Sequence, residues 1–355
     1  MLSLRRKIAQ MLIMGFSGYE INESSPVVDW LKADGLGGVL LFDYDLPAQK
    51  QGKNLYDRAQ IKRLNQDLNS FAALVNNPLP LFIAIDYEGG VVDRLSTVEG
   101  CMTTLLPCEQ AQLSADDLYE EAARMATTIK DLGFNLNFAP VVDLNLNDQQ
   151  GIIGKLGRCF STEPEIVSHA AKQFIRAFND QGIVCSYKHF PGHGSATGDT
   201  HEGFVDVTQT YEDRELLPYE GLSNKNTPVM VMTAHVINRK LDPSGLPATL
   251  SYPVLTELLR EKLGFNGVIV SDDLQMQAIS HHFSIDDALR MTINAGADML
   301  IFGNQLGSIT ATEVVDRVEQ LVHQGLIQHS RIDEAYARIA VLKQSLYSCN
   351  AAAIC

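Results

Sequence analysis

The sequence contains eight short apolar runs, separated by stretches with a different pattern. Each run is a few residues long and apolar nearly throughout, which is typical of parallel strands buried on both faces. The predicted strands cover residues 11–16, 38–42, 81–86, 135–140, 183–188, 229–235, 268–272 and 299–302.

Helical patterns lie between these runs. Apolar residues recur there at spacings of three and four, which predicts amphipathic helices with one face in the core. The last helix is expected to begin after a capping Ser330. The stripes are Ile61, Leu64, Leu68, Phe71 and Val75; Leu118, Ala122, Met125 and Ile129; Ile166, Ala170, Phe174 and Ala177; Val254, Leu255, Leu258 and Leu259; and Ile332, Ala335, Ile339 and Leu342.

Eight strand–helix units in 355 residues most simply close into a single (β/α)8 TIM barrel, an α/β fold, with an irregular strand order at the start as a variant. The alternative is an open doubly wound sheet. No G-x-G-x-x-G follows the first strand, which counts against that alternative. We expect one domain over residues 1–347 and a short tail over residues 348–355 that has no functional interpretation.

Composition narrows the class of protein. The formal net charge is −15, which disfavours nucleic-acid binding, and no run approaches the roughly 20 apolar residues that span a membrane. Residues 1–16 resemble a short signal peptide, but Gln10 interrupts the apolar run, so we predict a helix leading into a strand. The six cysteines show no C-x-x-C spacing, which favours reduced thiols in a cytoplasm; Cys101 and Cys108 are the one pair considered for a disulfide.

Residues 188–201, K-H-F-P-G-H-G-S-A-T-G-D-T-H, are unusually rich in titratable groups. Their Gly and Pro content predicts a loop. Asp199 and His201 are two residues apart, so in an extended segment their side chains would point the same way and form a proton-transfer pair. A surface Asp–His pair without a role and a metal site made from His189, His193 and His201 are the alternatives.

Charged residues also end several predicted strands. Asp86 ends the third, Lys188 and His189 end the fifth, His235 ends the sixth and Asp272 ends the seventh. In a barrel these ends share one face, where catalytic residues lie. The carboxylate of Asp272 could attack an electrophilic carbon there. The neighbouring Asp273 should point the other way, as a helix N-cap or supporting group. Arg94, Arg158 and Lys188 could bind an oxygen-rich ligand.

These residues resemble the signatures of family 3 glycoside hydrolases of the β-N-acetylhexosaminidase type. K-H-F-P-G-H-G followed by D-T-H, at residues 188–201, is the most specific match. The other matching segments, in family order between about Ile8 and Leu306, are D-x-E-G-G-x-V-x-R from Asp86 to Arg94, G-R-C-F from Gly157, M-T-A-H from Met232, S-D-D-L-x-M from Ser271 and A-G-A-D-M from Ala295.

The resemblance implies a retaining exo-β-N-acetylglucosaminidase on a TIM barrel. By that likeness Asp272 is the nucleophile and His201, held by Asp199, is the general acid/base. Five residues would bind the terminal sugar: Asp86, Arg94, Arg158, Lys188 and His189. The implied substrate is a peptidoglycan fragment, N-acetylglucosamine joined to anhydro-N-acetylmuramic acid with or without peptide, and the implied role is cytoplasmic cell-wall recycling. No cofactor or metal is expected, nor a nucleic-acid or membrane partner, and the protein is expected to be a monomer or weak homodimer.

Four alternatives stay open: a related phosphorylase, a β-glucosidase, a metal-dependent hydrolase and a non-catalytic saccharide-binding protein. The chain has no room for the second sandwich domain of many β-glucosidases, which favours the hexosaminidase. Tyr87, Val91, Asp93 and Val205 depart from the usual family residues. Tyr87 and Asp93 flank the sugar-binding segment, so they are expected to change which aglycone is accepted.

Overall fold

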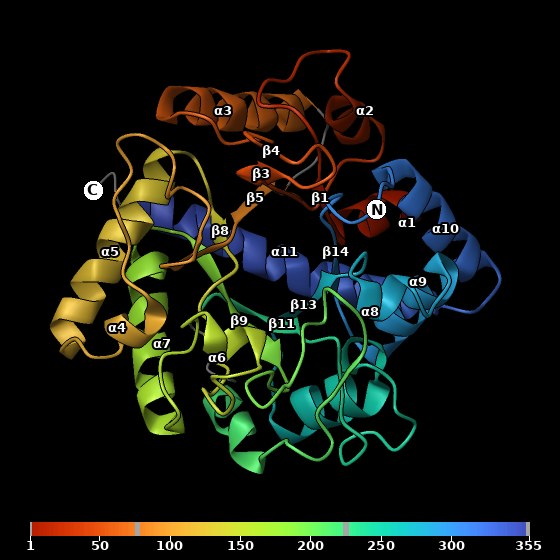
Figure 1. The fold of residues 1–355 in the computed structure, drawn as a ribbon. Helices are drawn as coiled ribbons and strands as arrows, with labels where there is room; N and C mark the ends of the chain where they lie inside the picture. Colours follow the sequence, from red (N-terminus) through yellow and green to blue (C-terminus); the bar gives the residue numbers. More distant parts are fainter. Residues whose placement is uncertain (1, 75–78, 223–226, 353–355) are drawn as a thin grey trace.

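The structure is a computed structural model that describes residues 2–74, 79–222 and 227–352. Eight parallel strands form a closed barrel in the order β1-β14-β13-β11-β9-β8-β5-β2, and helices surround it (Figure 1). The barrel strands are β1 (Leu12–Gly15), β2 (Gly38–Leu40), β5 (Phe82–Ile85), β8 (Leu136–Asn137), β9 (Val184–Phe190), β11 (Val229–Thr233), β13 (Val268–Asp273) and β14 (Met299–Phe302).

The barrel confirms the predicted (β/α)8 fold, and the closed ring excludes the open doubly wound sheet. The strands follow one another around the ring in chain order. The first strand pairs in parallel with both the second and the last, so the start of the barrel has no irregular strand order. All eight predicted strands are present, and each end lies within three residues of its expected position.

Helices connect the barrel strands and cover them on the outside. Two connections use other helix types: a 3₁₀ helix follows β9 and a π-helix follows β11. The helices are α1 (Leu4–Gln10), α2 (Pro26–Ala33), α3 (Arg58–Leu74), α4 (Pro107–Gln110), α5 (Ala115–Asp131), α6 (Ile152–Lys155), α7 (Pro164–Asp180), η1 (Asp213–Tyr219), η2 (Ala248–Leu250), η3 (Pro253–Lys262), α8 (Gln277–Ser280), α9 (Ile285–Ala295), α10 (Ala311–His323) and α11 (His329–Ala352).

Three two-stranded sheets decorate the connections. They pair β3 (Tyr44–Asp45) with β4 (Lys50–Gln51), β6 (Tyr87–Gly89) with β7 (Val92–Asp93), and β10 (Val205–Asp206) with β12 (Val236–Ile237).

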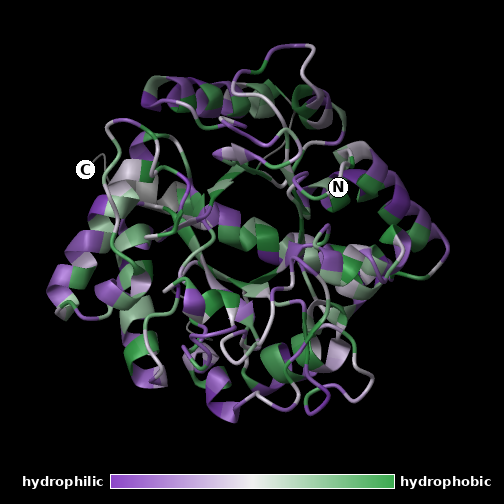
Figure 2. Cartoon of the chain, in the orientation of Figure 1, coloured by the Kyte–Doolittle hydropathy of each residue, from purple (hydrophilic) through white to green (hydrophobic). Residues whose placement is uncertain are grey.

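Local sequence explains where several helices begin. The hydroxyls of Ser114, Ser284 and Thr310 accept hydrogen bonds from backbone N–H groups at the starts of α5, α9 and α10. Gly296, with φ of 121°, ends α9. Hydrophobic and hydrophilic residues alternate along these helices, as amphipathic packing on the barrel requires (Figure 2).

The C-terminal helix α11 crosses the barrel and closes it at the amino-terminal ends of the strands (Figure 1). The ammonium of Lys343 donates to the carbonyl oxygen of Gly37, just before β2, at 2.6 Å, and to the side chain of Gln10 at 2.9 Å. The helix begins at His329, so Ser330 lies inside it and is not its N-cap. It also continues across the predicted boundary between residues 347 and 348.

The predicted core stripes are buried, with two exceptions. Ile166 is 44% exposed, because α7 turns Val167 toward the barrel in its place. Phe71 is partly buried, and Val75 lies outside the described residues. Cys101 and Cys108 are both free thiols, so the disulfide considered for them is absent. No helix in the described ranges has the length and apolar character needed to cross a bilayer.

Candidate active site

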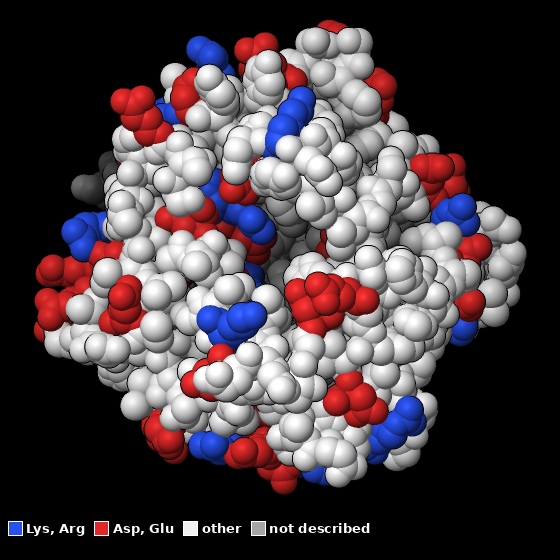
Figure 3. Space-filling view, in the orientation of Figure 1, with Lys and Arg blue, Asp and Glu red and all other residues white. Residues whose placement is uncertain are grey.

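A cavity of about 420 Å³ opens at the carboxyl-terminal ends of the barrel strands. This volume is in the range of small-molecule sites. Figure 3 shows the hollow on this face, with acidic and basic side chains gathered around it. All eight residues expected to act in catalysis or sugar binding line the cavity: Asp86, Arg94, Arg158, Lys188, His189, Asp199, His201 and Asp272.

The fifth strand extends further than predicted. It runs to Phe190, so Lys188 and His189 lie in β9 and not in a loop. The Gly and Pro residues that suggested a loop begin only at Pro191. Val142 N donates to the carbonyl of Lys188 and Ala234 N to that of Phe190, so neighbouring segments hold the strand on both sides.

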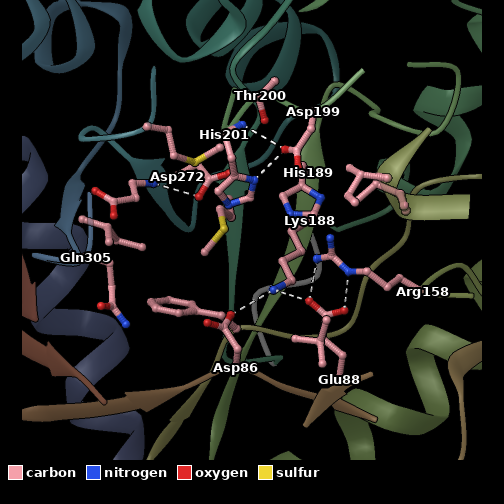
Figure 4. A pocket seen from close by; sticks show the side chains of 18 of the residues that line it. Asp86, Glu88, Arg158, Lys188, His189, Asp199, Thr200, His201, Asp272 and Gln305 are labelled. Carbon is pink, nitrogen blue, oxygen red and sulfur yellow. Dashed lines mark hydrogen bonds and ion pairs between the residues drawn. The ribbon is translucent and has the colours of Figure 1, made fainter. Parts of the chain in front are cut away.

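Four charged residues form an ion-pair network on one wall of the cavity (Figure 4). Arg158 binds Glu88 through two parallel hydrogen bonds of 2.9 and 2.8 Å. The ammonium of Lys188 lies 2.7 Å from the same Glu88 carboxylate and 3.1 Å from that of Asp86. Bidentate and shared bonds of this kind fix orientation as well as charge.

The ion-pair network keeps its members charged. Burial alone would raise the pKa of Glu88, but the charges of Arg158 and Lys188 hold that pKa well below its usual value. Burial likewise opposes charge on Lys188, while Glu88 and Asp86 raise its pKa. Glu88 was not predicted as a site residue, although it lies two residues beyond the predicted Asp86. Its role as the shared partner of two cations from distant segments became visible only in the fold.

Arg94 occupies the edge of this wall. Its guanidinium lies 3.4 Å from the Asp43 carboxylate and 3.9 Å from that of Asp86, and it covers the Phe42 ring. Its side chain is one-third exposed. It therefore lines the cavity as predicted, with weaker partners than Arg158.

His189 is oriented by a buried carboxylate that sequence reasoning missed. Its Nδ1 lies 2.7 Å from Asp143, which also accepts the backbone N–H groups of His189 and His193. This bond places a proton on Nδ1 and leaves Nε2 for the cavity. Burial would raise the pKa of Asp143, but His189 lowers it. Asp143 follows the fourth strand closely, so the rule about strand ends could have found it.

Asp272 lies at the end of β13, as predicted (Figure 4). Its Oδ1 accepts the N–H of Asp273 at 2.8 Å, and its own N–H donates to Thr233 at 3.3 Å. Burial would raise the pKa of Asp272, but His235, His189 and His201 lower it, so the carboxylate is ionised at neutral pH. An ionised carboxylate at the cavity is a competent nucleophile.

Asp273 supports neighbouring backbone, as one of its two expected roles required, but it is not a helix N-cap and does not point away from the cavity. It lines the cavity as well, and α8 begins later, with Met276 as its N-cap. The Asp273 carboxylate accepts the N–H of Gln275, and burial raises its pKa to about 6. The Nε2 of the buried His235 donates to the Asp273 carbonyl, so His235 supports this strand end and does not reach the cavity.

Asp199 and His201 form the predicted pair through a turn and not an extended segment. The Asp199 Oδ1 accepts both the backbone N–H of His201 at 2.9 Å and its ring Nδ1 at 2.6 Å. The hydrogen bond to Asp199 raises the pKa of His201. In Figure 4 the ring is seen next to Asp272, whose charge also raises the pKa of His201. His201 therefore has its Nε2 free to donate or accept a proton beside the Asp272 carboxylate.

The three histidines considered for a metal site have separate roles. His189 binds Asp143, His193 is buried near Thr200, and His201 binds Asp199. Throughout residues 2–74, 79–222 and 227–352, no cluster of three or more His, Cys, Asp or Glu side chains is arranged to hold a metal ion.

Two departures from the family pattern lie away from the cavity. Tyr87 and Asp93 pair with each other across the β6–β7 hairpin and are both buried, and the Asp93 carboxylate accepts a hydrogen bond from the Thr104 hydroxyl at 2.7 Å. Neither side chain lines the cavity, so the expectation that they select the aglycone is not supported.

Several known proteins are similar to this chain in sequence. Residues 3–342 match the family described as Glycosyl hydrolase family 3 N terminal domain. Beta-hexosaminidase A of Pseudoalteromonas piscicida is 33% identical over 334 residues, which is 88% of this chain and 54% of that protein. Beta-hexosaminidase LpqI of Mycobacterium tuberculosis is 32% identical over 97% of this chain and 83% of its own length.

A solved structure shows the same similarity in three dimensions. The glycoside hydrolase family 3 beta-N-acetylglucosaminidase of Paenibacillus sp. superposes with a TM-score of 0.86 at 32% identity, covering 98% of this chain and 63% of that one. The chain thus spans little more than half of the first relative and under two-thirds of this structure. The family match over nearly all of its length shows that the chain belongs to glycosyl hydrolase family 3.

Proposed function

We propose that this chain is a retaining exo-β-N-acetylglucosaminidase. The observation that carries the proposal is that the Asp199–His201 pair and the ionised Asp272 line the same cavity. Relatives named beta-hexosaminidase and a structural neighbour named beta-N-acetylglucosaminidase support the choice of sugar.

In the first half of the reaction, Asp272 attacks the anomeric carbon while His201 Nε2–H protonates the departing glycosidic oxygen. The bond from that carbon to the aglycone breaks and a bond to the Asp272 carboxylate forms. Asp199 stabilises the imidazolium before transfer and fixes its tautomer. In the second half, neutral His201 takes a proton from water, whose oxygen displaces Asp272 and regenerates the enzyme.

The ion-pair network and His189 form the sugar-binding wall in this proposal. Their charged groups present donors and acceptors to ring hydroxyls and an acetamido group, while the pairing keeps them in position before the sugar arrives. The natural substrate we propose is a peptidoglycan fragment, N-acetylglucosamine joined to anhydro-N-acetylmuramic acid.

The test is hydrolysis of a chromogenic β-N-acetylglucosaminide beside the matching β-glucoside, in phosphate-free buffer with a chelator. We expect cleavage of the acetamido sugar alone, with the β-anomer as the first product seen by NMR. Cleavage of the glucoside alone would indicate a β-glucosidase. Turnover only after phosphate is added, with release of a sugar 1-phosphate, would indicate a phosphorylase.

A second assay, with the disaccharide from peptidoglycan, then tests the natural substrate.

A further inference from the structure

The loop that carries Asp199 and His201 begins with a closely packed segment, residues 191–195, which we call its base. We call residues 191–204, between β9 and β10, the dyad loop. At its base, a Cβ on Gly194 would lie 1.8 Å from the carbonyl oxygen of Leu144, so the backbone fits there only because the residue is glycine. The hydroxyl of Tyr211 donates to the carbonyl of Pro191 at 3.0 Å. The base of the dyad loop is therefore fixed, whereas the His201 side chain is 56% exposed.

One buried carboxylate reaches this base from a different element. Glu215 lies on the 3₁₀ helix η1 and is 1% exposed. Its Oε2 accepts the backbone N–H of Gly194 at 3.1 Å and that of Ser195 at 3.4 Å. A Cβ on Gly192 would lie 2.8 Å from the same side chain, so the loop passes directly over Glu215.

Among the residues that the structure describes, no Lys, Arg or His forms an ion pair with the Glu215 carboxylate, although the exposed Arg214 next to it in the chain interacts with it electrostatically. Burial raises its pKa to about 7, with a smaller contribution from the charge of Asp143. Its other oxygen, Oε1, accepts the N–H of Glu212, the residue just before η1. A buried carboxylate without a cation is costly, so its bonds to the loop backbone are the interactions that offset this cost.

A contact chain leads from Glu215 to the catalytic pair. Next to Gly194 is His193, whose ring Nε2 lies 3.4 Å from the hydroxyl of Thr200. Thr200 stands between Asp199 and His201. Burial lowers the pKa of His193 to about 4, so its ring is neutral and serves as a packing and hydrogen-bonding element.

We propose that Glu215 is a positioning residue for the acid/base pair: by holding the backbone of Gly194 and Ser195, it sets the height of the dyad loop and hence the distance of His201 from the glycosidic oxygen. Glu215 does not line the cavity, so it acts through the loop and not on the sugar. This inference rests on the proposed function, because it needs His201 to be the proton donor.

The test compares two β-N-acetylglucosaminides, one with an alkyl aglycone that needs an acid and one with a dinitrophenyl aglycone that leaves unaided. Since kcat/KM reports the glycosylation half alone, it isolates the acid role. For Glu215→Ala we expect kcat/KM to fall about 10- to 100-fold for the alkyl substrate, the size of effect that a small misplacement produces. We expect less than about a threefold fall for the dinitrophenyl substrate.

Two variants separate positioning from damage to the fold. Glu215→Gln keeps an acceptor for the two N–H groups and should recover most of the activity. Asp213→Asn changes an exposed carboxylate on the same helix and should behave as the unmodified protein. In the His201→Ala background, Glu215→Ala should add almost no further loss, because the group that it positions is gone.

Each outcome is informative. Equal losses of kcat/KM on both substrates, or additive losses in the His201→Ala background, would overturn the positioning role. An undiminished Glu215→Ala would do the same. If His201→Ala itself shows no dependence on the leaving group, the acid assignment fails and with it the proposed function; if only Glu215→Ala shows none, this inference alone fails.

Discussion

The strand ends and the dyad loop hold their charged groups in different ways. At or just after the strand ends lie Asp86, Lys188 and Asp272, and Lys188 pairs with both Asp86 and Glu88. Glu88 in turn pairs with Arg158. In the dyad loop, Asp199 and His201 lie in a turn and bind mainly each other, with His201 more than half exposed. The ion-pair network is thus held by the tertiary fold, whereas the Asp199–His201 pair is assembled locally.

This difference suits the two tasks. Groups that recognise a sugar benefit from being in place beforehand, because their ordering cost is met during folding. In the proposed mechanism, the proton carrier serves two half-reactions with different partners, first the aglycone oxygen and then water. A group on an exposed turn can serve both, although any motion lowers the fraction of time it is correctly placed.

The largest effect should come from the strand-end side, with Asp272→Ala. Loss of the nucleophile should lower kcat by at least about 10⁴-fold, since no other described group stands where Asp272 does. The fold should persist, because Asp272 accepts just one hydrogen bond in the structure, from its neighbour Asp273. The measurement is turnover of a chromogenic N-acetylglucosaminide together with a thermal melt. Residual activity above about 1% would contradict the nucleophile assignment.

Breaking the ion-pair network should give the next largest effect. In Arg158→Ala, two charge-assisted bonds of Glu88 are lost, each worth about 1.5–3 kcal/mol. We expect KM to rise about 10- to 100-fold with a smaller change in kcat, and the melting temperature to fall. Arg290→Ala, which removes an exposed pair with Asp287, is the matched control. A normal KM would show that Arg158 does not hold the sugar.

The local side should respond to pH. Asp199→Asn removes the carboxylate whose hydrogen bond raises the pKa of His201, so that pKa should fall. The acid must be protonated, so activity falls as pH rises through this pKa. In the variant, the falling limb of the kcat/KM profile should therefore move to lower pH, with about a 10-fold loss near neutrality for a poor leaving group. An unmoved limb would mean that Asp199 does not tune the acid.

The smallest effect should come from the C-terminal end of the dyad loop, where it joins β10. Phe204 stacks on His282 with ring centroids 3.6 Å apart and meets Phe283 edge-on. Such contacts are worth about 0.5–1.5 kcal/mol, so Phe204→Ala should lower kcat/KM about threefold and make the loop easier to cleave by a protease. Tyr252→Ala, at another exposed aromatic, should change neither quantity. An unchanged protease sensitivity would show that the stack does not restrain the loop.

Predictions from the sequence worked best where the signal is a repeating pattern or a short continuous segment. The apolar runs predicted the eight strands, and a charged residue at a strand end placed Asp86, Lys188 and Asp272 on one face. It failed at partners from distant segments. Glu88 and Asp143 carry no local sign of the cations or imidazole that they bind, and Glu215 is an ordinary acidic residue in a short helical segment.

The sequence by itself thus determined the barrel, the position of Asp272 at a strand end and the pairing of Asp199 with His201, because each depends on a repeating pattern or a short spacing. The tertiary structure alone decided which buried carboxylates acquire charged partners. Glu88 is held ionised between two cations, whereas Glu215 has no ion pair among the described residues and burial raises its pKa to about 7. The physical reason is that the charge state of a buried group depends on what the fold packs around it, and those neighbours come from distant parts of the chain.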